Sequence, residues 1–167
     1  NIYEHVHAAL CGQWWWSDIN GDGVPNGYGV YDIEGNTIKN WYYMGVNDGM
    51  NYRDYQIRLY RGDLKSGTED CTFEQKHGHD VILANVFNAD NVNWEIEIFA
   101  DGVSEGLMEF IPEQKYTSSH LNVYYSPIAV PSDSCQDWWA IGYHIGYVGR
   151  NKTNNSYYVN CFHMYKH

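Results

Sequence analysis

Residues 28–43, with the sequence YGVYDIEGNTIKNWYY, carry the pattern that decides the fold. Residues 28–33 alternate along the chain, a Glu-Gly-Asn turn follows at residues 34–36, and the aromatic-rich residues 37–43 lead back. A period of two that is interrupted by a tight, glycine-containing turn is typical of a β-hairpin. The stretch therefore predicts two antiparallel strands.

Further short strands are expected between Gly, Asn, Asp and Pro turns. Residues 55–60 alternate with period two, and residues 81–87 are an apolar run typical of a strand that is buried on both faces. The remaining candidate strands are residues 94–99, 120–125, 138–148 and 156–165. Helical turns are expected only within residues 113–116 or 134–141.

The alternation within residues 94–99 also predicts which side chains are buried. Trp94, Ile96 and Ile98 should point inward, because they share one face of the expected strand. Glu95 and Glu97 should lie in solvent on the other face.

Seven or more short strands with turn residues between them predict an all-β fold, specifically an antiparallel β-sandwich of immunoglobulin-like type. The chain has 167 residues, without internal repeats or a linker, so residues 1–167 are expected to form a single domain. Asn1 is not a natural start, and the chain is expected to be part of a larger protein.

Composition excludes several classes of partner. The net charge is −11, which disfavours nucleic acid because phosphate binding depends on clustered Lys and Arg. No apolar run approaches the roughly 20 residues that a membrane span requires, so no span is expected.

Residues 18–23, DINGDG, resemble the start of a calcium-binding loop. The twelfth position of such a loop is Gly29 instead of a bidentate Glu, so the pattern favours polar side chains that cap turns. The candidate ligands are Asp18, Asn20 and Asp22. The glycines expected to supply positive φ in these turns are Gly21, Gly23 and Gly27.

Two histidine pairs have the spacing of metal ligands on a strand. His5 and His7 form one pair, and His77 and His79 form the other. A structural or surface role is favoured for both pairs. Four widely spaced cysteines lack any C-x-x-C pair, which disfavours a zinc site and leaves free thiols or disulfides open. They are Cys11, Cys71, Cys135 and Cys161.

Adjacent tryptophans raise the hypothesis of a binding or docking surface. Neighbouring residues on a strand point to opposite faces, so some of these rings can lie outside and stack on a sugar or on another domain. The alternative is that the rings pack in the core. The candidates are Trp14, Trp15, Trp16, Trp41, Trp138 and Trp139.

Several motifs of the chain together resemble a known family. They are EHVHAALCG at residues 4–12, the tryptophan run, DGVPNGY at 22–28, WYY at 41–43, YQIR at 55–58, VFNAD at 86–90, WEIEIFADG at 94–102 and HMY at 163–165. With these motifs the chain resembles the C-terminal domain of calcineurin-like phosphoesterases found in bacteria. The similarity extends over nearly the whole chain and is looser between residues 107 and 147.

The resemblance implies an accessory domain of an exported metallophosphoesterase, in the periplasm, on the cell surface or secreted. The hydrolytic centre and its pair of divalent metal ions are expected in a preceding catalytic domain, on which this domain docks or for which it positions substrate. The Asp-x-His and Gly-Asn-His motifs of that centre are absent from this sequence, so no catalytic residue and no cofactor are expected here. The alternative function is a free-standing module that binds glycans.

Overall fold

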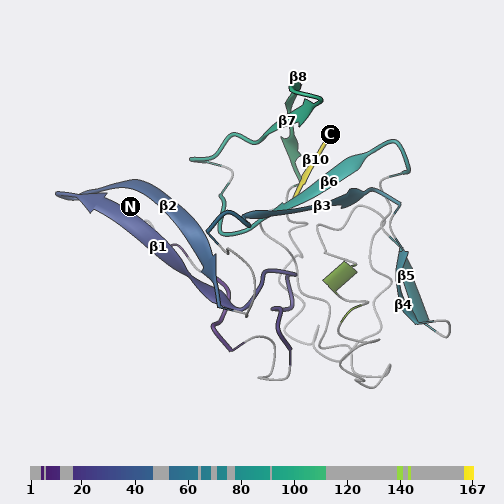
Figure 1. The fold of residues 1–167 in the computed structure, drawn as a ribbon, viewed down its shortest axis with the longest axis horizontal. Coiled ribbons are helices and arrows are strands. Elements are labelled where there is room, and N and C mark those ends of the chain that lie inside the picture. The colour runs from purple at the N-terminus through teal and green to yellow at the C-terminus, as the bar shows by residue number, and fades with distance from the viewer. Residues whose placement is uncertain are drawn as a thin grey trace, which may run out of the picture.

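The computed structural model describes residues 5, 7–11, 17–46, 53–63, 65–68, 71–74, 78–90, 92–111, 139–140, 143 and 164–167. All pairs of neighbouring strands in this part are antiparallel (Figure 1). The strands are β1 (Gly27–Glu34), β2 (Thr37–Gly45), β3 (Ile57–Arg61), β4 (Lys65–Thr68), β5 (Cys71–Glu74), β6 (Ile82–Val86), β7 (Glu97–Ala100), β8 (Val103–Leu107), β9 (Glu109–Phe110) and β10 (Met164–Lys166).

The central element is a four-stranded sheet in the order β3-β6-β10-β9. Strand β6 lies between β3 and β10, and its residues from Leu83 to Val86 are buried, as expected for a strand that is covered on both faces. β10 comes from the end of the chain and pairs with β6 and β9, so the sheet joins the two halves of the sequence.

Each face of this sheet has its own apolar cluster. On one face Tyr60, Leu83, Met164 and Ile111 pack together. The cluster on the other face includes Ile96, which belongs to the segment that crosses the sheet before β7. Its members are Ala84, Val86, Ala89, Ile96, Met108 and Tyr165. Side chains therefore cover the sheet from both sides.

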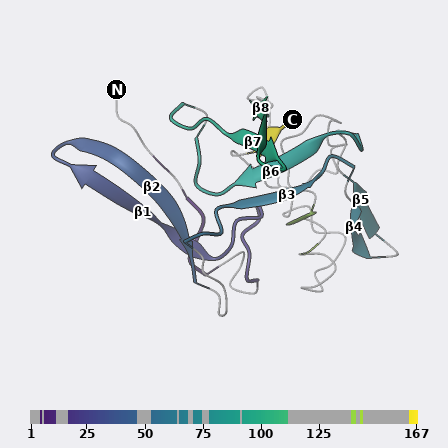
Figure 2. The same cartoon turned by 45° about the horizontal axis from the view of Figure 1, so that its top comes forward.

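The β1–β2 hairpin is the most extended element of the fold. Gly35 at its turn has φ +62°, a left-handed conformation that glycine adopts without the strain of a Cβ atom. The register shifts between Asp32 and Ile33, where a β-bulge bends the hairpin. In both views the hairpin runs away from the four-stranded sheet (Figures 1 and 2).

The β7–β8 hairpin turns at two left-handed residues, Asp101 with φ +51° and Gly102 with φ +83°. Asp-Gly is a dipeptide that favours such tight hairpin turns. The hairpin projects from the sheet on the side of β10 (Figure 1).

The sequence prediction of an all-β, antiparallel fold is confirmed for the described part. The predicted strands at residues 28–33, 37–43, 55–60 and 81–87 correspond to β1, β2, β3 and β6. The structure adds β4, β5, β8 and β9, which are short and largely polar and which the sequence analysis missed. An immunoglobulin-like strand order and a single domain over residues 1–167 stay predictions.

The strand expected at residues 138–148 is wrong where the structure describes it. Trp139, Ala140 and Tyr143 have helical backbone, in agreement with the alternative of a helical turn within residues 134–141. Ala140 is buried, and the Trp139 ring packs on Arg58 at a distance of 3.9 Å, so contacts with the sheet stabilise a turn here. The candidate segments at 113–116 and 120–125 lie outside the described residues.

The predicted inward and outward positions of residues 94–98 are confirmed. Ile96 is 7% exposed and packs in the core with the partly buried Trp94 and Ile98, whereas Glu95 and Glu97 are exposed. Regular strand geometry starts only at Glu97, although the Ile96 carbonyl still accepts a hydrogen bond from the Met108 N–H over 2.7 Å. Among the residues that the structure describes, no helix has the length and apolar character needed to cross a membrane.

Substitution Ile96→Ala should lower the free energy of unfolding by about 2–4 kcal/mol, because it removes buried methyl groups and leaves a cavity. Glu95→Ala, at the neighbouring exposed position, should change it by less than about 0.5 kcal/mol. Urea denaturation of the two variants measures both values. Equal or reversed effects would mean that the side chains of this segment are assigned to the wrong faces.

Candidate functional site

Several polar side chains meet at one place, which we call the loop junction. It consists of the loop at residues 17–26, the side chains of Tyr43, Arg58 and Asn85, which bond to that loop, and the side chain of Gln56, which bonds to the backbone of Tyr43. These side chains come from β2, the residue before β3, β3 and β6. The junction therefore connects the base of the β1–β2 hairpin to the four-stranded sheet.

Two neighbouring side chains of the sheet hold consecutive carbonyl groups of the loop. Arg58 and Asn85 are register partners on β3 and β6, so they point to the same face. Asn85 donates from Nδ2 to the carbonyl oxygen of Asp22 over 2.8 Å, and Arg58 donates from Nη1 to that of Gly23. The φ of Gly23 is +86°, and this left-handed turn presents both carbonyls to the sheet.

Gln56 links the hairpin to the start of β3. Its amide accepts a hydrogen bond from the Tyr43 N–H over 2.7 Å and donates to the Tyr43 carbonyl over 2.6 Å. The side chain thus makes the pair of bonds that a backbone residue of a neighbouring strand would make.

Tyr43 closes the junction from the hairpin side. Its hydroxyl donates to the Pro25 carbonyl over 2.6 Å, and the side chain is 1% exposed. Burial, and then the negative charge of Asp22, raise the pKa of Tyr43 well above its usual value. The phenol therefore remains a protonated donor over the physiological range of pH.

Asn20, one of the candidate calcium ligands, is buried and makes its bonds with the protein backbone. Its Oδ1 accepts from the Ala9 N–H over 3.2 Å, and its Nδ2 donates to the carbonyls of Ala9, Val24 and Pro25 over 3.0, 3.4 and 3.3 Å. Both polar atoms of the amide therefore bond to backbone groups, which supports the alternative that polar side chains of this loop cap its turns. A calcium ligand would instead direct an oxygen towards the ion.

The other two candidate ligands, Asp18 and Asp22, also contact the protein. The Asp22 carboxylate accepts from the Val24 N–H over 3.2 Å, which is the bond of an Asx turn. The Asp18 carboxylate accepts from the Tyr143 hydroxyl over 3.0 Å. Among the described residues, no three His, Cys, Asp or Glu side chains gather in a way that could hold a metal ion.

Of the three loop glycines that were expected to have positive φ, only Gly23 has it. Gly21 and Gly27 do not have positive φ. Gly27 is required for another reason, because a Cβ atom there would collide with the Met44 carbonyl oxygen and the Tyr43 ring. The close approach of β2, and not an unusual backbone conformation, explains this glycine.

Arg58 also lies between aromatic rings. Its guanidinium carbon is 3.9 Å from the centre of the Trp139 ring and 5.5 Å from that of Phe87. Trp139 in turn stacks on Tyr143 at 5.5 Å between ring centres. A cation–π contact at such a partly buried position stabilises the attachment of the helical turn to the loop junction.

Trp41 lies in an aromatic cluster at the middle of the hairpin. It is 8% exposed, and its indole Nε1 donates to the Asn88 carbonyl over 2.8 Å. Rings of His5, Tyr31 and Trp94 surround it at 5.4, 6.4 and 5.7 Å between centres. Of the other predicted binding tryptophans, Trp14, Trp15, Trp16 and Trp138 lie outside the described residues.

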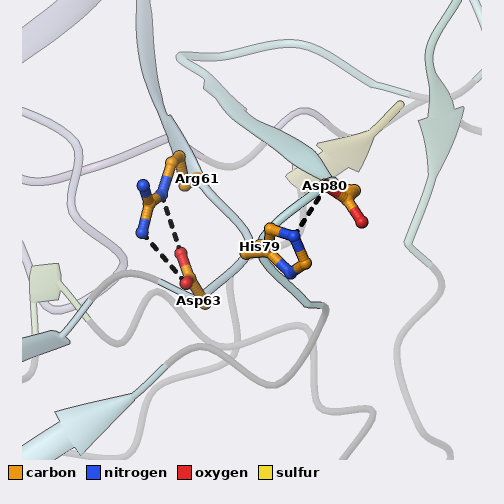
Figure 3. A network of polar contacts seen from close by, with 4 residues as sticks. All are labelled: Arg61, Asp63, His79 and Asp80. Atoms are coloured by element: carbon orange, nitrogen blue, oxygen red, sulfur yellow. Dashed lines mark hydrogen bonds and ion pairs between the residues drawn. The ribbon is translucent and has the colours of Figure 1, made fainter.

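The histidine pairs are not arranged alike. His5 is partly buried, and its Nδ1 lies 2.9 Å from the Tyr31 hydroxyl, whereas His7 is exposed. His77 lies outside the described residues. His79 is exposed and faces Asp80 at 2.9 Å, while Arg61 forms a separate bidentate pair with Asp63 (Figure 3).

Asn88, which the sequence analysis did not select, and Cys11 have unusual environments. Asn88 has φ +62° and is 4% exposed, and its amide oxygen and nitrogen have no hydrogen-bond partner. The preference of Asn for left-handed φ is the only local signal for it. Cys11, one of the four cysteines for which free thiols or disulfides were left open, is a free and exposed thiol.

Substitution Asn20→Asp distinguishes a calcium ligand from a structural amide. The variant loses the buried N–H donors and places a carboxylate against three carbonyl groups, so it should lose about 2 kcal/mol or more of unfolding free energy. Asn40→Asp is the control, because Asn40 is exposed and an Asp oxygen can still accept from the Trp41 N–H. It should change stability by less than about 0.5 kcal/mol.

The same variants are measured with and without calcium. A site with a dissociation constant of about 10 μM would add about 2.7 kcal/mol at about 1 mM calcium. We expect no such gain for the unsubstituted chain or for Asn20→Asp. Calcium-dependent stabilisation that increases in Asn20→Asp would contradict the structural role of this amide.

Comparison with known proteins agrees with this arrangement of motifs. The family model described as the C terminal of calcineurin-like phosphoesterase matches residues 4–128, about three quarters of the chain, and includes the whole loop junction but not the helical turn at Trp139. The motif at residues 163–165 lies beyond this match. No curated protein and no solved structure matches the chain. The chain belongs to the family of C-terminal domains of calcineurin-like phosphoesterases.

Proposed function

We propose that this domain is a non-catalytic accessory part of an exported bacterial metallophosphoesterase. In this proposal it packs on the catalytic domain and orders the mouth of the metal site or positions the substrate there. The family supports an association with a phosphoesterase domain. The exported, bacterial setting rests on the resemblance of the sequence alone.

The observation that carries the proposal is how the polar side chains of the loop junction are used. Arg58, Asn85 and Gln56 direct their donors at main-chain carbonyls within the domain. A group that binds substrate or transfers a proton must instead offer its donor or lone pair to the substrate. The loop junction is therefore suited to holding a shape, and the chemistry belongs to another domain.

The parent reaction in this proposal is metal-assisted hydrolysis of a phosphate ester. A pair of divalent ions in the catalytic domain would supply a bound hydroxide and would neutralise the charge that develops on phosphorus. The Asp-x-His and Gly-Asn-His motifs for such ions are absent from this chain, which supports the location of both ions in the neighbouring domain.

The alternative function, a free-standing glycan-binding module, requires aromatic rings that are open to a sugar. Trp41 is buried among His5, Tyr31 and Trp94, and Trp139 covers the Arg58 guanidinium. Both rings already pack against the protein, which favours the accessory role over the glycan-binding role.

Hydrolysis assays test the proposal directly. The 167-residue chain should not hydrolyse an aryl phosphate or a bis-aryl phosphate with added manganese, iron or zinc, whereas the protein that includes the preceding domain should. Metal-dependent turnover by the chain alone, retained through repurification and lost in the His77→Ala, His79→Ala double variant, would contradict the proposal. Protection of the tryptophan-rich segment from hydrogen exchange by a soluble polysaccharide would favour the glycan-binding alternative.

A further inference from the structure

One face of the β1–β2 hairpin carries a continuous row of apolar side chains. Tyr31 is paired with Trp41, and Ile33 is paired with Ile38, so all four side chains point to the same side. The row begins at Tyr43, which is buried at the base of the hairpin. We call this side of the hairpin, from Tyr31 outward, the arm face.

The outer part of the arm face is uncovered by the residues that the structure describes. All nine residues from 32 to 40 are exposed, and Ile33 and Ile38 are 63% and 37% exposed. The hairpin extends away from the four-stranded sheet in both views (Figures 1 and 2). A hairpin of two strands is only marginally stable in water without packing on one face, so this half requires a further contact.

The start of the domain crosses the arm face at its middle. His5 contacts the Tyr31 hydroxyl at 2.9 Å and the Trp41 ring at 5.4 Å between centres, and His7 lies 6.4 Å from the Tyr31 ring. In the proposed function a phosphoesterase domain precedes the family match, which begins at residue 4, one residue before His5. That domain would be tethered beside the arm face at an effective concentration on the order of millimolar.

We infer that the arm face is the docking surface for the preceding phosphoesterase domain, which covers Ile33 and Ile38 with an apolar patch. This inference rests on the proposed accessory function and assigns it a surface. The tip has the polar border that is common around such contacts, because Glu34 and Lys39 form an exposed ion pair at 3.2 Å. No large net charge on the tip opposes an apolar partner, since Asp32 is the one other ionisable residue among residues 32–40.

The β7–β8 hairpin provides a matched control. Val103 is 64% exposed, nearly the same as Ile33, and it also belongs to a projecting two-stranded hairpin. His5 and His7, near the start of the domain, contact the first hairpin at Tyr31 and Trp41. Ile33→Glu and Val103→Glu therefore place the same charge at equally exposed positions, and neither should disturb the core.

The test uses the protein that contains both domains. Lysine-specific cross-linking should connect Lys39 on the arm to the phosphoesterase domain in the unsubstituted protein and in Val103→Glu, but not in Ile33→Glu. Hydrogen exchange at the amides of residues 37–40 should be at least about tenfold faster in Ile33→Glu. The reason is that burial of an isoleucine side chain stabilises a contact by a free energy that corresponds to a factor of about ten or more in the equilibrium constant. Val103→Glu should leave this exchange unchanged.

The outcomes separate the docking surface from the proposed function. Cross-links from Lys65 or Lys166 without any from Lys39 would overturn the arm face as the docking surface and would leave docking itself intact. Domains that show no cross-links and tumble independently in solution would overturn the accessory function as well. Equal effects of Ile33→Glu and Val103→Glu on exchange would also overturn the assignment of the arm face.

Discussion

The structure depends on a small set of hydrogen bonds from side chains to the main chain of one loop. Asn85 and Arg58 hold the carbonyls of Asp22 and Gly23, and Tyr43 holds that of Pro25. These three side chains belong to separate strands, so the loop at residues 17–26 becomes the point where the hairpin and the sheet meet. Without these bonds, buried carbonyl groups would lose their partners, at a cost of about 1–3 kcal/mol each.

The polar side chains that surround this loop are bonded to main-chain groups of the domain itself. The amide of Asn20 and that of Gln56 are likewise engaged with backbone groups. The motifs that identify the family therefore describe a scaffold, and the scaffold directs the β1–β2 hairpin outward. A rigid base with an uncovered tip is the geometry expected of a domain that contacts a tethered neighbour, in agreement with the accessory function that we propose.

Local signals in the sequence were sufficient for part of the fold. Alternation and the Gly35 turn predicted the hairpin, and the apolar run predicted β6, because these patterns depend only on neighbouring residues. The loop junction could not be predicted, since no local pattern indicates that Asn85 binds the carbonyl of Asp22, 63 positions away. Gly27 was assigned to a turn for the same reason: the Tyr43 ring that excludes its Cβ comes from the opposite strand. On β3, Ile57 and Leu59 are exposed while Arg58 points to the junction, which residue type alone does not suggest.

A double-mutant cycle between Arg58 and Asn85 tests the central claim, that these residues act together to hold the loop. The free energy of unfolding is measured by urea denaturation for Arg58→Ala, Asn85→Ala and the double variant. Because either substitution releases the loop from the other partner too, the account predicts a coupling energy above about 0.5 kcal/mol, with the double variant less destabilised than the sum of the single ones. Additive effects would contradict the account, since each side chain would then stabilise the fold independently of the loop.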